Sequence, residues 1–372
     1  MKIALAHDWL NQLGGAEDVL AHLHGFFPQA PILTSIYDRP RLPKSWQSWD
    51  IRSTGLDRLP GIHRNHQPYM PLFAWSWAHR TVPADYDVVL SNKSAFCIGV
   101  RPLNPAARHI CYCLTPTRFT YDFDSYVGRG ERIPPGAGAI LRALNTYLRR
   151  WETQAAQRVH QFIAISREVQ TRIKQLYSRD SVVIYPPVEM PDWQPGWARQ
   201  TDEGFYLIVS RLLPYKRIDL AIEALSQLGL PLVIAGDGRD RPRLEQLAAR
   251  AKSQHPPANV TFLGRVSDAA LADLLTRCKA FIFPGFEDFG IAPIRAMAYG
   301  KPVIALAKGG ALDTVLPNRT GTLFAEPLVN HLIEAVQKNS EVTFAPVEIR
   351  RHAEQFGVAR FQRELFELLT VY

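Results

Sequence analysis

Residues able to bind a charged ligand recur in the loops that follow apolar segments of this sequence. Arg211 ends the apolar segment 205–210, and Lys216 opens the amphipathic segment that follows it. A guanidinium and an ammonium that converge between a strand and a helix can neutralise a diphosphate. A cation at the start of a helix also opposes the helix dipole, which favours an anion beside it. The pair therefore predicts a diphosphate site, with a solvated helix face as the alternative.

Two further loops combine glycine with polar groups. Gly14 and Gly15 precede a helical segment, so their backbone N–H groups can approach a phosphate, and a tight turn that needs positive φ is the alternative. In "FPGFEDFGIAPIRAMAYG", Glu287 lies on a loop and Gly290 opens a helix that continues with Ile291. Glu287 can accept hydrogen bonds from sugar hydroxyls, while the helix N-terminus can bind phosphate. The first loop could therefore bind a phosphate, and the second could bind a phosphate together with a sugar.

A fourth loop, "FLGRVSD", leads from a strand into a helix capped by Ser267 or Asp268. The backbone of Arg265 and Val266 can hydrogen-bond a flat heterocycle there, although a plain strand-to-helix turn explains the same residues. The first strand is not followed by a Gly-x-Gly-x-x-Gly fingerprint, which argues against a dinucleotide dehydrogenase.

These loops are positioned by short apolar segments that alternate with amphipathic ones. Their hydrophobicity is continuous rather than alternating, which predicts strands covered on both faces and hence parallel sheets. The expected strands are 2–6, 31–35, 87–91, 109–113, 161–166 and 181–185, then 205–210, 231–236, 260–264, 280–284 and 301–306. The fold class is therefore α/β, with two doubly wound parallel-sheet domains.

The Pro- and Gly-rich stretch 185–204 separates the two series of strands. We expect an N-terminal domain over 1–190, a hinge linker over 191–203 and a C-terminal domain over 204–349. The amphipathic segment 350–372 closes the second domain or packs back onto the first.

Composition narrows the class of protein. The chain has 372 residues and a formal charge of +8, which implies an anionic partner. The basic residues are spread along the chain rather than clustered, which argues against nucleic acid. The four cysteines have neither metal-site nor Cys-x-x-Cys spacing, so they are expected to be reduced core residues of a cytoplasmic protein. The first apolar segment is broken by His7 and Asp8, which predicts a buried strand rather than a signal peptide.

Taken together, these motifs resemble the retaining glycosyltransferases of family 4, also called group 1, with the GT-B fold. The resemblance covers nearly the whole chain through motifs that follow the family's order and spacing: "HDWL…GGAE", "SRLLPYKRID", "IAGDG", "FLGRVSD" and "FPGFEDFG". "LPGIHRNHQPYMPL" and "HICYCLTPTRFTYD" look most like the branch with mannosyltransferases of surface and exported polysaccharides. The resemblance to this family implies two Rossmann-like domains that face a central cleft.

The resemblance also implies roles for the residues. Arg211 and Lys216 hold the diphosphate of the donor and stabilise its growing charge, and Glu287 orients the donor sugar. The remaining donor-binding residues are assigned to the base, the phosphates and the ribose of the nucleotide. They are Arg265, Val266, Gly14, Gly15, Gly290, Ile291 and Arg295. Asp8 and Arg118 are assigned to the acceptor side. Fixed cations replace a metal ion, so neither metal nor cofactor is expected beside the GDP- or UDP-sugar substrate.

Two positions depart from the family pattern. Arg295 replaces a glutamate that accepts hydrogen bonds from the ribose hydroxyls, and a guanidinium has no acceptor. Leu114 stands where many relatives have histidine. A catalytically degenerate sugar-nucleotide-binding subunit is one alternative, and a nonhydrolysing sugar-nucleotide epimerase is another. We expect an active hexosyltransferase, because a lost ribose contact should raise KM more than it lowers kcat.

The acceptor is expected to be a saccharide, and a lipid-linked one in particular. Residues 63–80 interleave basic or histidine positions with aromatic ones, as suits a membrane interface. A helix with core aromatics is the alternative. This predicts a peripheral contact with an anionic membrane at the cytoplasmic face of the plasma membrane.

Overall fold

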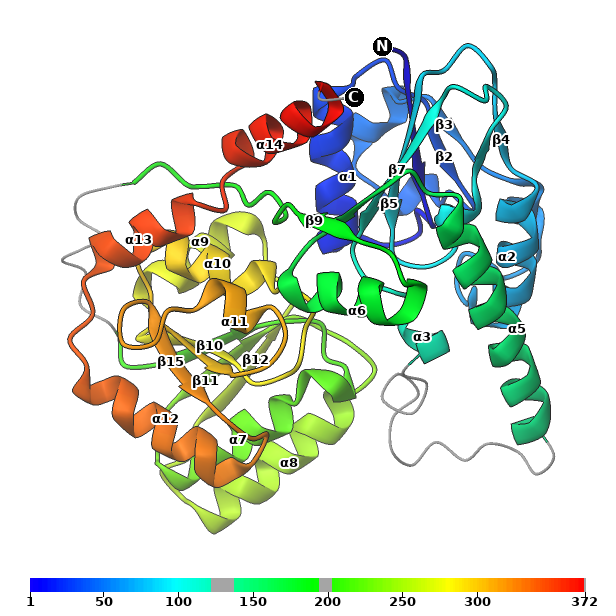
Figure 1. Cartoon of the computed structure of the whole chain (residues 1–372). Helices are drawn as coiled ribbons and strands as arrows, with labels where there is room; N and C mark the ends of the chain where they lie inside the picture. Colours follow the sequence, from blue (N-terminus) through cyan, green and yellow to red (C-terminus); the bar gives the residue numbers. More distant parts are fainter. Residues whose placement is uncertain (122–136, 194–202, 371–372) are drawn as a thin grey trace. The chain divides into compact units, whose positions relative to one another are not determined.

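The computed structural model describes residues 1–121, 137–193 and 203–370 (Figure 1). The chain divides into two compact units, Met1–Pro186 and Pro187–Tyr372. The predicted hinge at 191–203 lies largely outside the described residues. Val188 N donates a hydrogen bond to Phe356 O inside the second unit, and a return of the segment 350–372 to the first domain stays a prediction.

The first unit is built on a seven-stranded sheet in the order β3-β2-β1-β5-β7-β8-β9, in which all neighbours are parallel. The central strands β1 and β5 are buried along their whole length, because helices cover both faces. The strands are β1 (Ile3–His7), β2 (Ile32–Thr34), β3 (Ile51–Arg52), β5 (Val88–Lys93), β7 (Arg108–Cys113), β8 (Gln161–Ala164) and β9 (Ser181–Val183). A separate pair joins β4 (Thr81–Val82) to β6 (Arg101–Pro102).

The helices of this unit follow the strands along the chain. They are α1 (Gly15–Phe26), α2 (Met70–Ala78), α3 (Arg118–Tyr121), α5 (Ala137–Gln157) and α6 (Arg167–Tyr177). Short 3-10 turns lie at η1 (Arg39–Arg41), η2 (Lys44–Ser48), η3 (Gly55–Arg58), η4 (Gln67–Tyr69) and η5 (Cys97–Gly99). Phe73 and Trp77 of α2 join Val89 of β5 in one buried core cluster, so α2 packs against the sheet.

The second unit contains a six-stranded parallel sheet in the order β12-β11-β10-β13-β14-β15. Its strands are β10 (Tyr206–Val209), β11 (Leu232–Ala235), β12 (Val260–Gly264), β13 (Ala280–Phe283), β14 (Val303–Leu306) and β15 (Gly321–Phe324). The edge strand β12 alternates between exposed and half-buried residues before Gly264, as expected where one face is only partly covered. The prediction of two α/β domains with parallel sheets is confirmed.

Helices cover both faces of this second sheet (Figure 1). One core cluster joins the sheet to α7 (Ile218–Gln227), α8 (Arg241–Gln254) and α12 (Val329–Glu341). The remaining helices are α9 (Asp268–Arg277), α10 (Ile291–Ala298), α11 (Ala311–Thr314), α13 (Pro346–Glu354) and α14 (Val358–Thr370), with the 3-10 turn η7 (Pro214–Lys216).

Strand order sets where each unit can bind a ligand. In an open parallel sheet a crevice forms at the carboxyl ends of the two strands where the order reverses. In the second unit this switch point lies between β10 and β13, and in the first unit between β1 and β5. The motif "SRLLPYK" follows β10 and "FEDFG" follows β13, while "HDWL…GGAE" follows β1.

Candidate functional site

Lys216 and Glu287 meet at the switch point of the second unit. Lys216 ends the 3-10 turn after β10, Glu287 lies on the loop after β13, and their side chains form an ion pair. The Lys216 side chain is 12% exposed and that of Glu287 22%, so the pair is screened less than a surface pair. The structure therefore brings together two of the three residues predicted to act in catalysis.

The loop that carries Lys216 is held by backbone bonds to the neighbouring strand end. Ser210 N donates to Ala235 O (3.1 Å), and Leu212 N donates to Asp237 O (3.0 Å). A Cβ on Gly236 would overlap the carbonyl of Ser210, so glycine is needed there for the two loops to touch. The loop geometry thus depends on "IAGDG" as well as on its own residues.

The loop that carries Glu287 depends on one of its own glycines and on a glycine pair from another segment. A Cβ on Gly285 would lie 2.7 Å from Lys216 O, so this glycine lets the two site loops come into contact. Gly310 N donates to Glu287 O (2.9 Å). A Cβ on Gly309, which has φ of +63°, would overlap that same carbonyl. The glycine pair after β14 therefore fixes the backbone at Glu287.

Gly290 begins α10 in the left-handed conformation, with φ of +92°. A Cβ there would lie 2.8 Å from the ring of Phe283, so both conformation and space require glycine. No side chain caps this N-terminus. Ile291 follows as the first helical residue and is half-buried. The N–H groups of this turn can therefore bind an anion, as the sequence predicts.

The remaining predicted donor residues of the second unit lie at the same edge of its sheet. Arg211 is exposed on the loop after β10. Arg265 is exposed and Val266 half-buried on the loop after β12. Gly236 N donates to Gly264 O (2.6 Å) and links the ends of β11 and β12. All of these positions are therefore compatible with one extended ligand across the carboxyl ends of the strands.

Arg295 lies on the second turn of α10 and is half-buried. It is close enough to Tyr299 to act on its ionisation: burial raises the pKa of the Tyr299 phenol, and Arg295 partly opposes that rise. The carboxylate of Glu287 is paired with Lys216. A contact of Arg295 with ribose or phosphate stays a prediction.

In the first unit, Gly14 and Gly15 form the start of α1. Gly14 is extended, with φ of −176°, and neither glycine is among the residues of positive φ. The alternative of a turn that needs positive φ is therefore wrong at these positions. Asn92 Nδ2 donates to Ala16 O (2.8 Å) and thereby joins the glycine loop to the end of β5. Backbone contact of Gly14 and Gly15 with a phosphate stays a prediction.

Glu17, the acid of "GGAE", points into the first unit. Its Oε1 lies 3.5 Å from His7 Nε2, and both side chains are at most 3% exposed. Asn92 Nδ2 lies 3.2 Å from His7 Nδ1. Glu17 therefore helps to hold the glycine loop on β1.

Asp8 is buried and organises the loop after β5. One carboxylate oxygen accepts from Ser94 N (2.7 Å), Ser94 Oγ (3.0 Å) and Ala95 N (2.7 Å). The other accepts from Phe96 N (2.5 Å) and Cys97 N (2.7 Å). These five bonds give Asp8 a structural task at the β1–β5 switch point. The acceptor contact assigned to it stays a prediction.

Arg118 begins α3 next to a buried ion pair that the sequence reasoning missed. Lys93 Nζ lies 2.7 Å from Glu152 Oε1, and both side chains are at most 1% exposed. Burial alone would lower the pKa of Lys93, but the charge of Glu152 raises it well above its ordinary value. Lys93 also donates to Thr115 O (2.9 Å), and Glu152 accepts from Thr117 Oγ1 (2.6 Å). The pair therefore holds the loop between Leu114 and Arg118.

The aromatic residues of 63–80 divide between core and surface. Phe73 and Trp77 are fully buried, as the core interpretation predicts. Leu72 is 43% exposed and Trp75 57% exposed. The helix α2 therefore presents an apolar pair to solvent while its opposite side packs inward.

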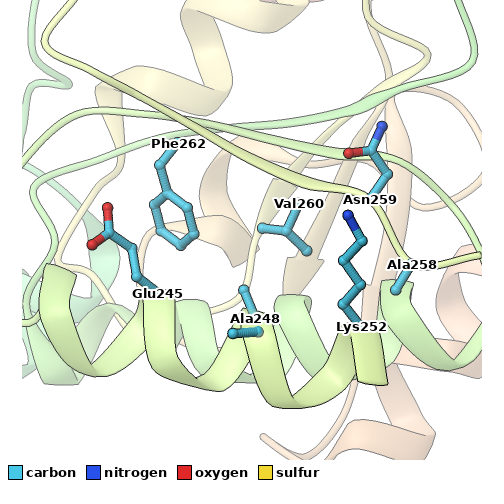
Figure 2. A pocket seen from close by; sticks show the side chains of 8 residues that line it. Glu245, Ala248, Lys252, Ala258, Asn259, Val260 and Phe262 are labelled. Carbon is cyan, nitrogen blue, oxygen red and sulfur yellow. The ribbon is translucent and has the colours of Figure 1, made fainter. Parts of the chain in front are cut away.

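A separate cavity of about 200 Å³ lies between α8 and the edge strand β12 (Figure 2). Glu245, Ala248 and Lys252 of α8 face Val260 and Phe262 of β12 across it. None of the predicted site residues lines this cavity.

The four cysteines are free and buried, as predicted for reduced core residues. Within the described ranges, no group of three or more His, Cys, Asp or Glu side chains is arranged to hold a metal ion. Over the same ranges, no helix has the length and apolar character needed to cross a membrane.

Comparison with known sequences connects this site to a family. Residues 189–355 match the family described as Glycosyl transferases group 1. The chain is 28% identical over 320 residues to the alpha-1,3/1,6-mannosyltransferase ALG2 of Homo sapiens, a match that covers 77% of this chain and 73% of the relative. It is 32% identical over 166 residues to the D-inositol 3-phosphate glycosyltransferase of Mycobacterium avium, which covers 41% of this chain and 39% of the relative.

Solved structures are similar over the whole chain. HepE of Anabaena, in complex with UDP, superposes with a TM-score of 0.73 at 18% identity and covers 100% of both chains. Sucrose-phosphate synthase of Thermosynechococcus elongatus gives 0.71 at 17% identity, with 99% of this chain and 98% of that chain covered. These likenesses identify the fold as GT-B. Residues 189–355 therefore match a group 1 glycosyltransferase domain, and the chain over most of its length is similar to mannosyltransferases.

Proposed function

We propose that this protein is a retaining hexosyltransferase that moves mannose from a nucleotide-diphosphate sugar to a saccharide acceptor in glycan synthesis. The observation that carries the proposal is the Lys216–Glu287 pair at the β10–β13 switch point. The sugar assignment is supported by the mannosyltransferase relatives. GDP-mannose is the first candidate donor, and UDP-sugars are the second.

Lys216 and Arg211 would grip the diphosphate. As the glycosidic bond breaks, negative charge grows on the leaving phosphate, and fixed cations stabilise it most in a partly dehydrated site. The half-buried position of Lys216 suits this task. The N–H groups that begin α10 would bind further phosphate oxygens.

Glu287 would orient the donor sugar by accepting hydrogen bonds from its hydroxyls. The leaving phosphate oxygen would take the acceptor's proton on the face from which it departs, so that the new bond forms there and the anomeric configuration is retained. The cations supply the charge stabilisation that a divalent ion gives in other transferases. The proposal therefore includes neither metal nor cofactor.

Arg295 would alter the ribose contact rather than the chemical step. A guanidinium cannot accept the hydrogen bonds of the ribose hydroxyls. Because ground and transition states share ribose binding, the expected cost falls on KM. Arg295→Glu should strengthen nucleotide binding and leave turnover unchanged. A wild-type protein that binds nucleotide but transfers no sugar from any donor would instead indicate a degenerate, binding-only subunit.

A donor panel tests the proposal directly. A nucleotide at 100 times its Kd should add about 2.7 kcal/mol to the free energy of unfolding. The melting temperature of the protein is measured with GDP, UDP, ADP and their sugar conjugates. Nucleotides of one base should raise it, and those of the other bases should not. The sugar conjugate of that base should then support transfer to a saccharide. If no nucleotide changes the melting temperature, the proposed donor site is wrong.

The acceptor is proposed to be lipid-linked, presented at an anionic membrane. The exposed Leu72 and Trp75 of α2, together with the charge of +8, support a peripheral contact. Liposomes with anionic lipid should carry the protein upward in a flotation gradient at physiological salt. Trp75→Ala should weaken this flotation, while Trp46→Phe, at a buried position, should not. Absence of wild-type binding would remove the membrane part of the proposal.

A further inference from the structure

A second cavity, of about 280 Å³, lies in the first unit away from its predicted site. Its chemically active lining is Arg101, Arg158, His109 and His160, and the described residues that line it include no carboxylate. His109 is the second residue of β7, and His160 directly precedes β8. The cavity is therefore at the amino ends of these strands.

The position separates the cavity from the loops that carry Asp8 and Leu114. Those loops follow the carboxyl ends of β1 and β7. A strand rises about 3.3 Å per residue, so β7 alone puts roughly 16 Å between its two ends. The cavity must be explained by something other than the proposed transfer site.

The two guanidinium groups have the same charge and lie near each other. Burial lowers the pKa of Arg158, and the charge of Arg101 lowers it further. Over the described part of the chain, neither Arg101 nor Arg158 forms an ion pair with a carboxylate. Both arginines are exposed, and an anion between these two adjacent cations would relieve their mutual repulsion.

The negative C-terminal end of helix α5 does not balance the positive charge of Arg101 and Arg158. Arg158 directly follows α5, and its side chain donates one long bond to this helix, from Nη1 to Gln154 O (3.4 Å). Arg179 already occupies this helix end, since it donates to Ala156 O (3.0 Å) and Val159 O (2.6 Å). The helix dipole is therefore compensated mainly by Arg179, and the charges of the cavity remain available.

His160 adds a neutral donor. Its Nδ1 accepts from His109 N (3.0 Å), so the proton of the neutral ring is on Nε2. The His109 ring is used elsewhere, because its Nε2 lies 2.9 Å from Ser91 Oγ. Asn104 also lines the cavity, but its side chain already forms hydrogen bonds: Nδ2 donates to Tyr86 O, and Oδ1 accepts from Ala106 N.

We propose that this cavity is a second anion site that binds a phosphate group between Arg101 and Arg158, with His160 Nε2–H as a third donor. Two guanidinium forks and one imidazole match the three oxygens of a phosphate monoester. Such a group occurs on small phosphorylated molecules and on phosphatidic acid. The inference does not depend on the proposed transferase activity.

The first arm of the test uses inorganic phosphate and the NMR signals of the histidine rings. His160→Asn identifies the His160 signal. In the wild type this signal should shift saturably with phosphate but not with chloride at equal ionic strength. Arg101→Gln with Arg158→Gln should weaken binding at least about tenfold, because hydrogen bonds from a charged donor to phosphate are stronger than neutral ones.

The matched control removes two charges from α5 outside the cavity. Arg142→Gln with Arg150→Gln changes exposed residues of the same unit and should bind phosphate like the wild type. Should the cavity double variant melt early, Arg101→Gln alone, at an exposed position, should still weaken binding. Local readout at His160 keeps the result separate from any phosphate bound near Lys216.

The second arm identifies the source of the phosphate. Vesicles of phosphatidylcholine with phosphatidic acid are compared with phosphatidylcholine alone in flotation. A His160 shift with inorganic phosphate and no Arg101-dependent flotation supports a soluble phosphorylated ligand. Flotation that requires Arg101 and Arg158 supports a lipid headgroup. If phosphate leaves the His160 signal in place and both double variants float equally, the proposal is wrong.

Discussion

Replacing Glu287 by glutamine should move two properties of this enzyme in opposite directions. Glu287 pairs with Lys216, the cation proposed to hold the donor diphosphate. Glutamine keeps the size of the side chain but removes the negative charge. Lys216 is then released for phosphate, and a charge that repels the diphosphate disappears. Binding of the free nucleoside diphosphate should tighten, while turnover should fall because the donor sugar loses its charged hydrogen-bond acceptor.

The magnitude follows from how far the pair is buried. Exposed ion pairs contribute about 0.2–1 kcal/mol, and breaking a fully buried pair costs about 3–5 kcal/mol. With side-chain exposures of 12% and 22%, the Lys216–Glu287 pair falls between these limits, at about 1–2 kcal/mol. Since 1.4 kcal/mol is tenfold, Kd should decrease by a factor of roughly 5–30. The loss in kcat should be about a hundredfold or more, as for other groups that act on the transition state.

Calorimetric titration with the nucleoside diphosphate and a steady-state transfer assay measure the two effects. Glu348→Gln is the matched control, because Glu348 forms an exposed pair with Arg351 in the same unit; it should change neither constant. If Glu287→Gln folds normally and binds the diphosphate no better than wild type, Lys216 is not the diphosphate ligand. If its turnover is unchanged, Glu287 has no part in the chemical step.

Three further predictions concern stability. Lys93→Met leaves a buried carboxylate without its partner and should cost about 3–5 kcal/mol in urea unfolding; a cost below about 1 kcal/mol would contradict the buried pair. Gly309→Ala should lower the melting temperature, because its Cβ meets the Glu287 carbonyl at positive φ, whereas Gly25→Ala, inside α1 with open space around it, should not. Burial lowers the pKa of His109 from 6.5 to about 3. Between pH 3 and 6.5, His109 is therefore protonated in the unfolded chain but not in the folded protein. Stability should therefore decrease from pH 6.5 toward 3 by up to about 1.4 kcal/mol per pH unit, and His109→Gln should remove that part of the slope.

The fold could be predicted because buried parallel strands have a simple pattern. Continuous apolar segments marked eleven strands of the two main sheets to within a few residues. The four-residue strand β15, which begins with Gly321, was missed, as were three strands of two residues each: β3, β4 and β6. So few residues do not establish a periodicity. The pairing partner of a short strand supplies the information that its own sequence lacks.

The sequence predicted which edge of the sheet carries the site, but it did not predict which side chains pair there. Parallel strands place their carboxyl ends together, so the loops of Arg211, Lys216 and Glu287 had to share one edge. The pairing of Lys216 with Glu287 depends on β10 and β13 being neighbours in the sheet, which no local pattern states. Family spacing could suggest that these loops act together, but not that they neutralise each other.

Buried charges were the main omission. Lysine and glutamate are almost always exposed unless they are paired, so Lys93 and Glu152, 59 positions apart in the chain, gave no local signal. Lys93 does end an apolar strand, which is a hint that can be searched for. Asp8 was noticed for its place after β1, yet its five hydrogen bonds to residues 94–97 required the three-dimensional structure.

The contact of Gly309 and Gly310 with the backbone of Glu287 limits how this enzyme can be redesigned. Two stretches of chain about twenty residues apart share one tightly fitted joint that leaves no space for a side chain. A loop exchanged from a homologue with another sugar preference would clash with its new neighbour unless both stretches were transplanted together. Recombination at this edge should therefore succeed with cassettes that start before 284 and end after 311.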